Sequence, residues 1–506
     1  MRYYLGLDNG GTSTKASLYD SGGREACTRS AETAIIAPRP GFAERDMEEM
    51  WQSNCRVIRS VLEASGVRSA DIAAAAVCGH GKGLYLWGKS GKPVRNGICS
   101  TDGRAWAYAE RWKADGTERE AFRRSCQHVL ACQPVALLRW LADNEPDALE
   151  RTQWVFECKD YIRFRLTGAA RAERTDYSGA NLLNLHTAEY DEELLRLFGL
   201  ERMRGALPPL CGTTEICGQV SRGAAAQTGL LEGTPVAGGM FDIDACALAV
   251  GCTDDTHVCM IAGTWSINEY VRETPVLDGS ALMNSLFCIP GRYLVEECSP
   301  TSAGNNEWYV HTLLPELAEA CGQSGTSVYE RENAWVEGLP ASESCPVFLP
   351  FLFGSNEHPN ATGGFIGLSG YHTRAHLTRS VYEGVAFSHR QHLERLLKTR
   401  ETPPEGIRLA GGAARSAVWT QMFADVMRLP VETVQARETG TLGCAMAAAV
   451  AAGEYADLAD AAAHMTKLSR AVRSNEENAA AYDQKYALYQ KVVGALGCVW
   501  DEGKAF

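Results

Sequence analysis

The segment from Leu5 to Asp20, LGLDNGGTSTKASLYD, constrains the fold of this chain more than any other stretch. Alternating apolar residues lead into Asp8, a glycine turn follows, and a second apolar run predicts a β-hairpin. Glycines let backbone N–H groups approach an anion, and an aspartate at a strand end can hold hydrated Mg²⁺. The pattern indicates a phosphate-binding hairpin, although an ordinary hairpin with a turn rich in Ser and Thr would show it as well.

A second hairpin is predicted in the other half of the chain. The segment VCMIAGTWSINEYV, Val258 to Val271, repeats the order of apolar strand, glycine turn and second strand. Strand-like and helix-like segments alternate throughout, which is typical of an α/β fold. Two similar hairpins predict an internally duplicated fold with a ligand cleft between the halves, and the alternative is a coincidence between two unrelated hairpins.

Composition excludes several classes of function. A chain of 506 residues predicts at least two domains, and its net charge of −13 argues against a nucleic acid or an acidic membrane surface as a partner. No apolar run is long enough to span a bilayer. The 18 cysteines are scattered singly, which fits the reducing cytoplasm better than a secreted disulfide framework.

Phosphoryl transfer needs a phosphate cradle, a metal anchor and a base aimed at the acceptor hydroxyl. Asp8 precedes a run of hydroxyl residues, which suits phosphate and metal, whereas Asp242 lies among apolar neighbours, which suits a base. Asp244 is a competitor, because residues two apart lie on the same side of an extended segment. A helix N-cap is the structural alternative for either aspartate.

A third glycine site lies near the end of the chain. Gly411, Gly412 and Ala413 follow a short strand and precede a helix expected to begin near Ser416. Such a turn can accept adenine or ribose against its backbone, and the N-terminus of a helix favours anions. A plain turn between a strand and a helix is the alternative.

These motifs together resemble the FGGY family of carbohydrate kinases over nearly the full chain. The similar segments are LGLDNGGTSTKA, GGMFD, AGTWS, AGGAARSAVWTQMFADV and GGFIGLSGYHTRAHLTRSVYE, of which the last is the most specific. Two positions depart from the family pattern, because Gly11 stands where many members carry Thr and Leu137 where Lys is usual.

The resemblance implies two actin/hexokinase-like (ribonuclease H-like) ATPase domains, residues 1–247 and 248–506, with ATP and Mg²⁺ as cofactors. It implies that Asp242 is the catalytic base, chosen over Asp244 by the register of GGMFD, and that Asp8 and Asp242 hold Mg²⁺ through water. The expected ATP-binding residues are Gly10, Gly11, Thr12, Ser13, Lys15, Gly263, Thr264, Gly411, Gly412, Ala413 and Ser416.

The sugar site is placed by analogy with the same family. The expected residues are His80, Gly81, Lys82, Asp102, Arg104 and Asp242. An aspartate binds two hydroxyls well, but an Asp102–Arg104 structural pair and a solvated Lys82 are the competing interpretations.

The expected function is phosphorylation of a small ketose at its terminal hydroxyl. Long segments, among them RPGFAERDMEEMW and ECSPTSAGNNEWY, resemble the family members that act on L-xylulose. The alternatives are D-xylulose, L-ribulose, 3-keto-L-gulonate or glycerol as substrate, or a sugar sensor that has lost catalysis. The only partners expected are the sugar and a second copy of the chain in a homodimer.

Overall fold

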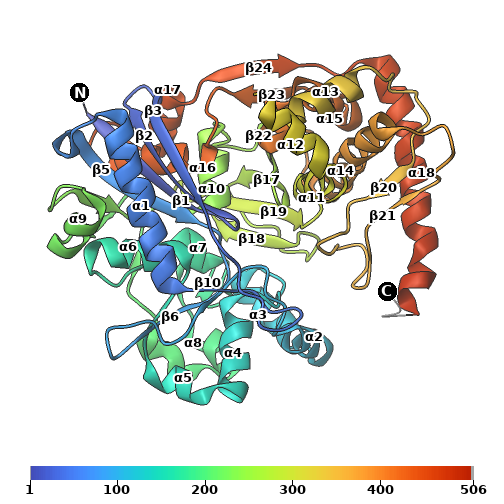
Figure 1. The fold of residues 1–506 in the computed structure, drawn as a ribbon. Helices are drawn as coiled ribbons and strands as arrows, with labels where there is room; N and C mark the ends of the chain where they lie inside the picture. Colours follow the sequence, from blue (N-terminus) through green and yellow to red (C-terminus); the bar gives the residue numbers. More distant parts are fainter. Residues whose placement is uncertain (1, 503–506) are drawn as a thin grey trace. The chain divides into compact units, whose positions relative to one another are not determined.

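The computed structural model describes residues 2–502, which form two compact units (Figure 1). Unit 1 contains the chain up to Thr253 together with Val271–Val295 and Glu438–Lys467. Unit 2 contains Asp254–Tyr270, Glu296–Arg437 and the chain from Leu468 onward. The division expected between residues 247 and 248 stays a prediction.

The sheet of unit 1 is built on the first predicted hairpin. Strand β1 (Tyr3–Asn9) pairs antiparallel with β2 (Ser13–Asp20) and parallel with β5 (Ile72–Gly79). The strand order is β13 (Ile216–Gln219), β14 (Pro235–Ala237), β5, β1, β2 and β3 (Glu25–Glu32), and β15 (Met240–Phe241) also pairs with β5. A central strand with parallel and antiparallel neighbours confirms the expected α/β class.

The helices of unit 1 show why the chain folds locally as it does. Helix α1 (Met47–Ser65) begins at Asp46, whose carboxylate accepts from two free N–H groups, and ends at Gly66 in the left-handed region. It buries Trp51 and Ile58 in the same core as strands β1, β2 and β5. The apolar residues of this segment recur at helical spacing, which places them together on the buried face.

Helix α16 (Thr439–Ala451) packs against strands β1 and β5. The approach is very close, because a Cβ at Gly6 of β1 would lie 1.9 Å from the carbonyl oxygen of Thr441. Gly443 is equally confined, with a built Cβ only 2.3 Å from the carbonyl oxygen of Ala245. Glycines thus bring the N-terminus of this helix to the end of β1.

Unit 2 repeats the same arrangement around the second predicted hairpin. Strand β16 (His257–Ala262) pairs antiparallel with β17 (Ser266–Arg272) and parallel with β22 (Gly406–Gly411). Strands β23 (Val431–Val434) and β24 (Leu468–Val472) follow on the far side of β22. The repeated order of pairing is what an internally duplicated fold predicts.

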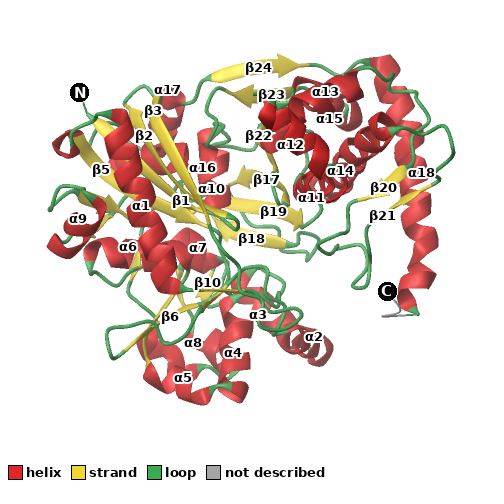
Figure 2. Ribbon diagram, viewed as in Figure 1, coloured by secondary structure: helices red, strands yellow, loops and turns green. Residues whose placement is uncertain are grey.

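The other elements are shown in Figure 2, with helices in red and strands in yellow. In the first part of the chain they are β3 (Glu25–Glu32), β4 (Glu44–Arg45), β6 (Tyr85–Gly88), β7 (Gly97–Ile98), α2 (Trp106–Asp115), α3 (Thr117–Ser125), α4 (Pro134–Asn144), α5 (Pro146–Arg151), β8 (Thr152–Phe156), α6 (Cys158–Thr167), β9 (Ala172–Glu173), α7 (Arg174–Ser178), β10 (Leu183–Asn184), β11 (Glu189–Tyr190), α8 (Glu192–Phe198), β12 (Leu210–Cys211), β13 (Ile216–Gln219), α9 (Arg222–Thr228), β14 (Pro235–Ala237), β15 (Met240–Phe241) and α10 (Asp242–Ala249). The later ones are β18 (Met283–Leu286), β19 (Tyr293–Ser299), α11 (Gly304–Leu313), α12 (Pro315–Gln323), α13 (Val328–Glu337), β20 (Val347–Leu349), β21 (Gly364–Ile366), α14 (Arg374–Leu397), α15 (Ala417–Met427), α17 (Leu458–Met465) and α18 (Glu476–Asp501). Among these described helices none combines the length and the apolar character needed to cross a membrane.

Candidate active site

The register of the unit 1 sheet brings the ends of three strands together. Strand β5 lies between β1 and β15 and is parallel to both. On one side Asp8 is opposite Cys78, and on the other Phe241 is opposite Gly79. Asp242 follows Phe241 directly, so the two predicted aspartates flank the carboxyl end of β5. This edge of an α/β sheet is where ligands bind in open parallel sheets.

Asp242 is the first residue of helix α10 (Asp242–Ala249), so the extended conformation expected around it is wrong. Residues two apart in a helix do not share a face, and Asp242 and Asp244 therefore lie in different surroundings. Asp244 is fully buried and accepts a hydrogen bond of 2.8 Å from the backbone N–H of Cys288. Asp242 is half-buried and is not an N-cap, since Phe241 holds that position.

Three charged side chains act on Asp242 from nearby. Burial raises the pKa of Asp242 well above its usual value, and the negative charges of Asp8 and Asp176 raise it further. The ammonium of Lys82 opposes this and lowers the pKa. Asp242 therefore lies in an acidic, poorly solvated environment in which a cation would stabilise its charged form.

Asp8 lies against the N-terminus of α16. A Cβ at Gly440 would be only 2.8 Å from Oδ2 of Asp8. Burial raises the pKa of Asp8, and the positive charge of Lys15 lowers it. Lys15 in turn forms an ion pair of 2.6 Å with Glu438, a partner that the sequence did not reveal.

Asp8 is suited to hold a hydrated cation. Its Oδ1 is buried without a hydrogen-bond partner among the described residues, which leaves one acceptor for a ligand. Residues 2–502 contain no group of three or more His, Cys, Asp or Glu side chains arranged around a metal position. Mg²⁺ keeps several of its waters and often uses only one or two carboxylates, and Asp8 and Asp242 are the two predicted carboxylates at this strand edge.

The first glycine turn, Gly10–Ser13, joins β1 to β2 in unit 1. Gly11 and Thr12 are exposed at its tip, so their backbone groups can reach a ligand. Arg45 is buried and donates a hydrogen bond to the carbonyl oxygen of Gly11, which holds the backbone of the turn in place. The Gly11 position is open, since a Cβ there would meet nothing within 4 Å.

The second glycine turn and the third glycine site both lie in unit 2. Thr264 is exposed, and the carbonyl of Gly263 accepts a hydrogen bond of 3.2 Å from the N–H of Gly304. Gly411 has φ +86°, and a Cβ there would lie 2.5 Å from the carbonyl oxygen of Ala262. A short 3₁₀ turn over Gly412–Arg415 follows.

Ser416 is the N-cap of helix α15 (Ala417–Met427), which begins where the sequence predicted a helix. Its hydroxyl accepts from the N–H of Trp419 at 3.1 Å and donates to Oδ1 of Asn333 at 2.6 Å. The hydroxyl is therefore engaged within the protein, and the N–H of Ser416 donates to the carbonyl oxygen of Ala413 at 3.1 Å.

The turn after β5 carries the residues predicted for the sugar. Lys82 has φ +65°, and its N–H donates to Oε2 of Glu157 at 2.9 Å. Its ammonium lies 5.2 Å from the centre of the Phe241 ring. Gly81 has no room for a side chain, because a Cβ would lie 2.4 Å from the Phe241 ring and 2.8 Å from Oδ1 of Asp176.

His80 is buried in the same turn and is neutral. Burial and the nearby charge of Arg45 lower its pKa to about 3. Its Nε2 forms a hydrogen bond of 2.8 Å with the hydroxyl of Tyr85. The ring is thus held by the protein itself.

Asp102 and Arg104 form a buried pair whose contacts are nearly all internal. Arg104 binds both oxygens of Asp102, at 2.9 and 2.8 Å, and its Nη2 lies 2.7 Å from Glu44. Its guanidinium lies 4.1 Å from the centre of the Phe42 ring, and Asp102 also accepts from the N–H of Ala43. Only Nη1 of Arg104 is buried without a hydrogen-bond partner among the described residues.

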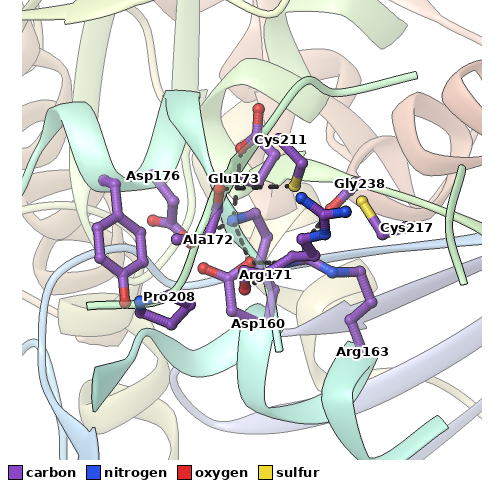
Figure 3. A network of polar contacts seen from close by, with 12 residues as sticks. Asp160, Arg163, Arg171, Ala172, Glu173, Asp176, Pro208, Cys211, Cys217 and Gly238 are labelled. Carbon is purple, nitrogen blue, oxygen red and sulfur yellow. Dashed lines mark hydrogen bonds and ion pairs between the residues drawn. The ribbon is translucent and has the colours of Figure 1, made fainter. Parts of the chain in front are cut away.

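The sequence did not reveal a buried ionic network whose member Asp176 acts on Asp242. Figure 3 shows part of it, with Asp160, Arg163, Glu173 and Asp176 labelled. Lys159 has no exposed surface and lies 2.9 Å from Asp176, 3.2 Å from Asp160 and 3.4 Å from Glu173. Arg163 lies 2.8 Å from Asp160. The Asp160–Arg163 spacing of three residues was the available signal, since residues three apart share a face of a helix.

The family is established by comparison with known proteins. Residues 3–249 match the N-terminal domain of the FGGY family of carbohydrate kinases, and residues 258–452 match its C-terminal domain. The chain is 39% identical to the L-xylulose/3-keto-L-gulonate kinase of Escherichia coli K12, over 98% of this chain and 97% of that protein. It is 37% identical to a probable L-xylulose kinase of Pasteurella multocida, over 98% of this chain and 99% of that protein.

Solved structures show the same fold. The xylulose kinase of Lactobacillus acidophilus has a TM-score of 0.87 at 24% identity, covering 99% of this chain and all of that one. The xylulose kinase of Rhodospirillum rubrum has a TM-score of 0.81 at 27% identity, with 99% of this chain and all of that one covered. The expected two-domain fold is confirmed, and this chain belongs to the FGGY family of carbohydrate kinases.

Proposed function

We propose that this kinase transfers the γ-phosphate of ATP to the terminal hydroxyl of a ketose, and that L-xylulose is its preferred substrate. The observation that carries the proposal is the meeting of Asp8, Asp242 and the Lys82 turn at the carboxyl end of β5. The substrate follows from full-length similarity to kinases named for L-xylulose.

In this proposal Asp242 accepts the proton of the attacking hydroxyl. Its partly apolar surroundings suit a base that must be close to an uncharged alcohol and shielded from bulk water. Lys82, on the adjacent turn, favours the ionised form of Asp242 that can accept a proton. The role of Asp244 is structural, because its carboxylate is buried and bonded to the backbone of Cys288.

Nucleotide binding is assigned to three glycine sites. Gly10–Ser13 and Gly263–Thr264 would bind phosphates through backbone N–H groups and hydroxyls, and Gly411–Ala413 would take the adenosine. Lys15 would act through its ion pair with Glu438 and not as a free phosphate ligand. Asp8 and Asp242 would hold Mg²⁺ through water, and the ion would neutralise charge on the transferring phosphate.

A coupled assay of ADP release tests the function. The purified chain is mixed with ATP, Mg²⁺ and each of L-xylulose, D-xylulose, L-ribulose and glycerol, and phosphate position is read from the product by ³¹P NMR. We expect ADP release with ketoses and phosphate on the terminal oxygen. A protein that binds a sugar but releases no ADP with any of them would be a sensor, and the proposal would be wrong.

A second candidate substrate is 3-keto-L-gulonate, which carries a carboxylate. The observation that favours it is the buried cation of Lys82 near Asp242, since a lysine can bind an anionic group of a sugar acid. If this substrate is used, Lys82→Met should lower turnover of 3-keto-L-gulonate more than that of L-xylulose. Equal losses would leave L-xylulose as the better assignment.

We also propose a homodimer in the cytoplasm. The 18 cysteines all lie within the described residues, and most are buried as small apolar side chains, which fits a reducing compartment. Light scattering of the purified chain gives the oligomeric state directly.

A further inference from the structure

The backbone that leads into Asp242 is held by groups outside its own short strand. Arg163 donates to the carbonyl oxygen of Gly238, and the N–H of Gly239 donates to Thr213 at 3.0 Å. The N–H of Phe241, one residue before Asp242, donates to the hydroxyl oxygen of Thr175 at 2.9 Å. The position of Asp242 therefore depends on side chains that are 66 or more residues earlier in the chain.

Thr175 connects this backbone to the buried ionic network. Its hydroxyl donates to Oε2 of Glu173 at 2.7 Å while accepting from Phe241. Its own N–H donates to the same oxygen at 3.1 Å. Because a hydroxyl has one proton, donation to Glu173 turns a lone pair toward the N–H of Phe241.

Glu173 is itself fixed on both oxygens. Its Oε1 accepts from the hydroxyl of Thr213 at 3.0 Å, and its Oε2 lies 3.4 Å from the ammonium of Lys159. All of these side chains have less than a tenth of their surface exposed. A buried network of this kind resists distortion, since moving one member leaves a buried charge or donor unpaired.

We infer that Thr175, oriented by Glu173, is a positioning residue that sets the place of Asp242 for proton transfer. This inference rests on the proposed role of Asp242 as the base. Thr175 touches no reacting atom, and its effect is on the geometry of the carboxylate relative to the hydroxyl. Misplacement of a catalytic group by about 1 Å costs roughly 10²-fold in rate without a matching loss of ground-state binding.

The test compares Thr175→Val with Thr175→Ser. Valine keeps the shape of threonine and removes the acceptor for Phe241, whereas serine keeps the hydroxyl. We expect Thr175→Val to lower kcat by roughly 10- to 100-fold with KM for the ketose within about threefold of wild type. Thr175→Ser should restore kcat to within about threefold. Thr175→Ala serves as a second variant without the acceptor and must show the same loss if valine prevents folding.

Thr213→Val is the matched structural control. It removes a hydrogen bond to the other oxygen of Glu173 and leaves the Phe241 contact in place. Wild-type kcat in Thr175→Val, or equal loss of kcat in Thr175→Val and Thr213→Val at equal loss of thermal stability, would overturn the inference.

Asp242→Asn, measured beside them, separates this inference from the proposed function. If Asp242→Asn keeps wild-type kcat, the assigned base is wrong and the inference falls with it. If Asp242→Asn is inactive and Thr175→Val is wild type, only the positioning role is wrong.

Discussion

The two glycine hairpins share a backbone arrangement but carry different chemistry. In the first, Asp8 of β1 is paired across the strands with Lys15 of β2. At the matching place in the second, Ile261 of β16 is paired with Ile267 of β17. Each hairpin presents glycine and threonine at its tip, but only the first has ionisable side chains at this pair; in the second, Glu269 lies two pairs further along, opposite Cys259. Both hairpins supply backbone N–H groups at their tips, but the carboxylate suited to a metal ion, Asp8, belongs to the first hairpin.

The largest expected effect is at Asp242, which lies at the same strand edge as Asp8 of the first hairpin. Asp242→Asn should leave folding and ATP binding nearly unchanged and lower turnover by roughly 10²- to 10⁴-fold, because it removes the proton acceptor. The measurement is kcat with L-xylulose, with calorimetric ATP binding as the check on integrity.

Asp244→Asn is the matched control for that prediction. It keeps an oxygen for the N–H of Cys288, so turnover should stay within about threefold of wild type, with any loss appearing as thermal stability. A loss of turnover in Asp244→Asn alone would show that Asp242 is the wrong aspartate and that Asp244 is the base.

The second-largest effect is expected at Asp8, whose pairing with Lys15 distinguishes the first hairpin from the second. Asp8→Asn should weaken Mg²⁺ dependence, so that the Mg²⁺ concentration for half-maximal turnover rises by roughly tenfold or more and maximal turnover falls. Sugar binding should persist. An unchanged Mg²⁺ response would exclude Asp8 from the metal site.

The smallest effect is expected at the second hairpin, which has Ile261 where the first has Asp8. Thr264→Val removes one exposed hydroxyl and should raise KM for ATP by about three- to tenfold, the value of a single hydrogen bond of ~0.5–1.5 kcal/mol. Thr264→Ser should behave like wild type. A loss as large as that of Asp8→Asn would mean that the two hairpins contribute equally to catalysis.

Local sequence patterns were sufficient to predict the hairpins on which the two sheets are built. Glycine turns between apolar runs predicted both hairpins, and the turn at Gly411 predicted the helix α15, whose N-cap is Ser416. These features depend on neighbours in sequence, so one chain is enough to find them.

Features set by distant residues were missed. The helix that begins at Asp242 was expected as extended chain, because Met240, Phe241 and Ile243 form an apolar run that strands and helices share. Thr175 and Glu173 carried no signal, since their importance comes from contacts with Phe241 and Lys159 that folding creates. The sequence left Asp102 and Arg104 open between a sugar contact and a structural pair, and the contacts of Arg104 with Glu44 and Phe42 could be seen only in three dimensions.

The substrate is the central claim, and specificity constants for L-xylulose and D-xylulose test it most directly. The two sugars present their hydroxyls to different partners, and one unpaired buried polar group costs ~1–3 kcal/mol, or roughly ten- to hundredfold in kcat/KM. The account predicts that kcat/KM for L-xylulose exceeds that for D-xylulose by at least about tenfold. A preference of the same size for D-xylulose would contradict it.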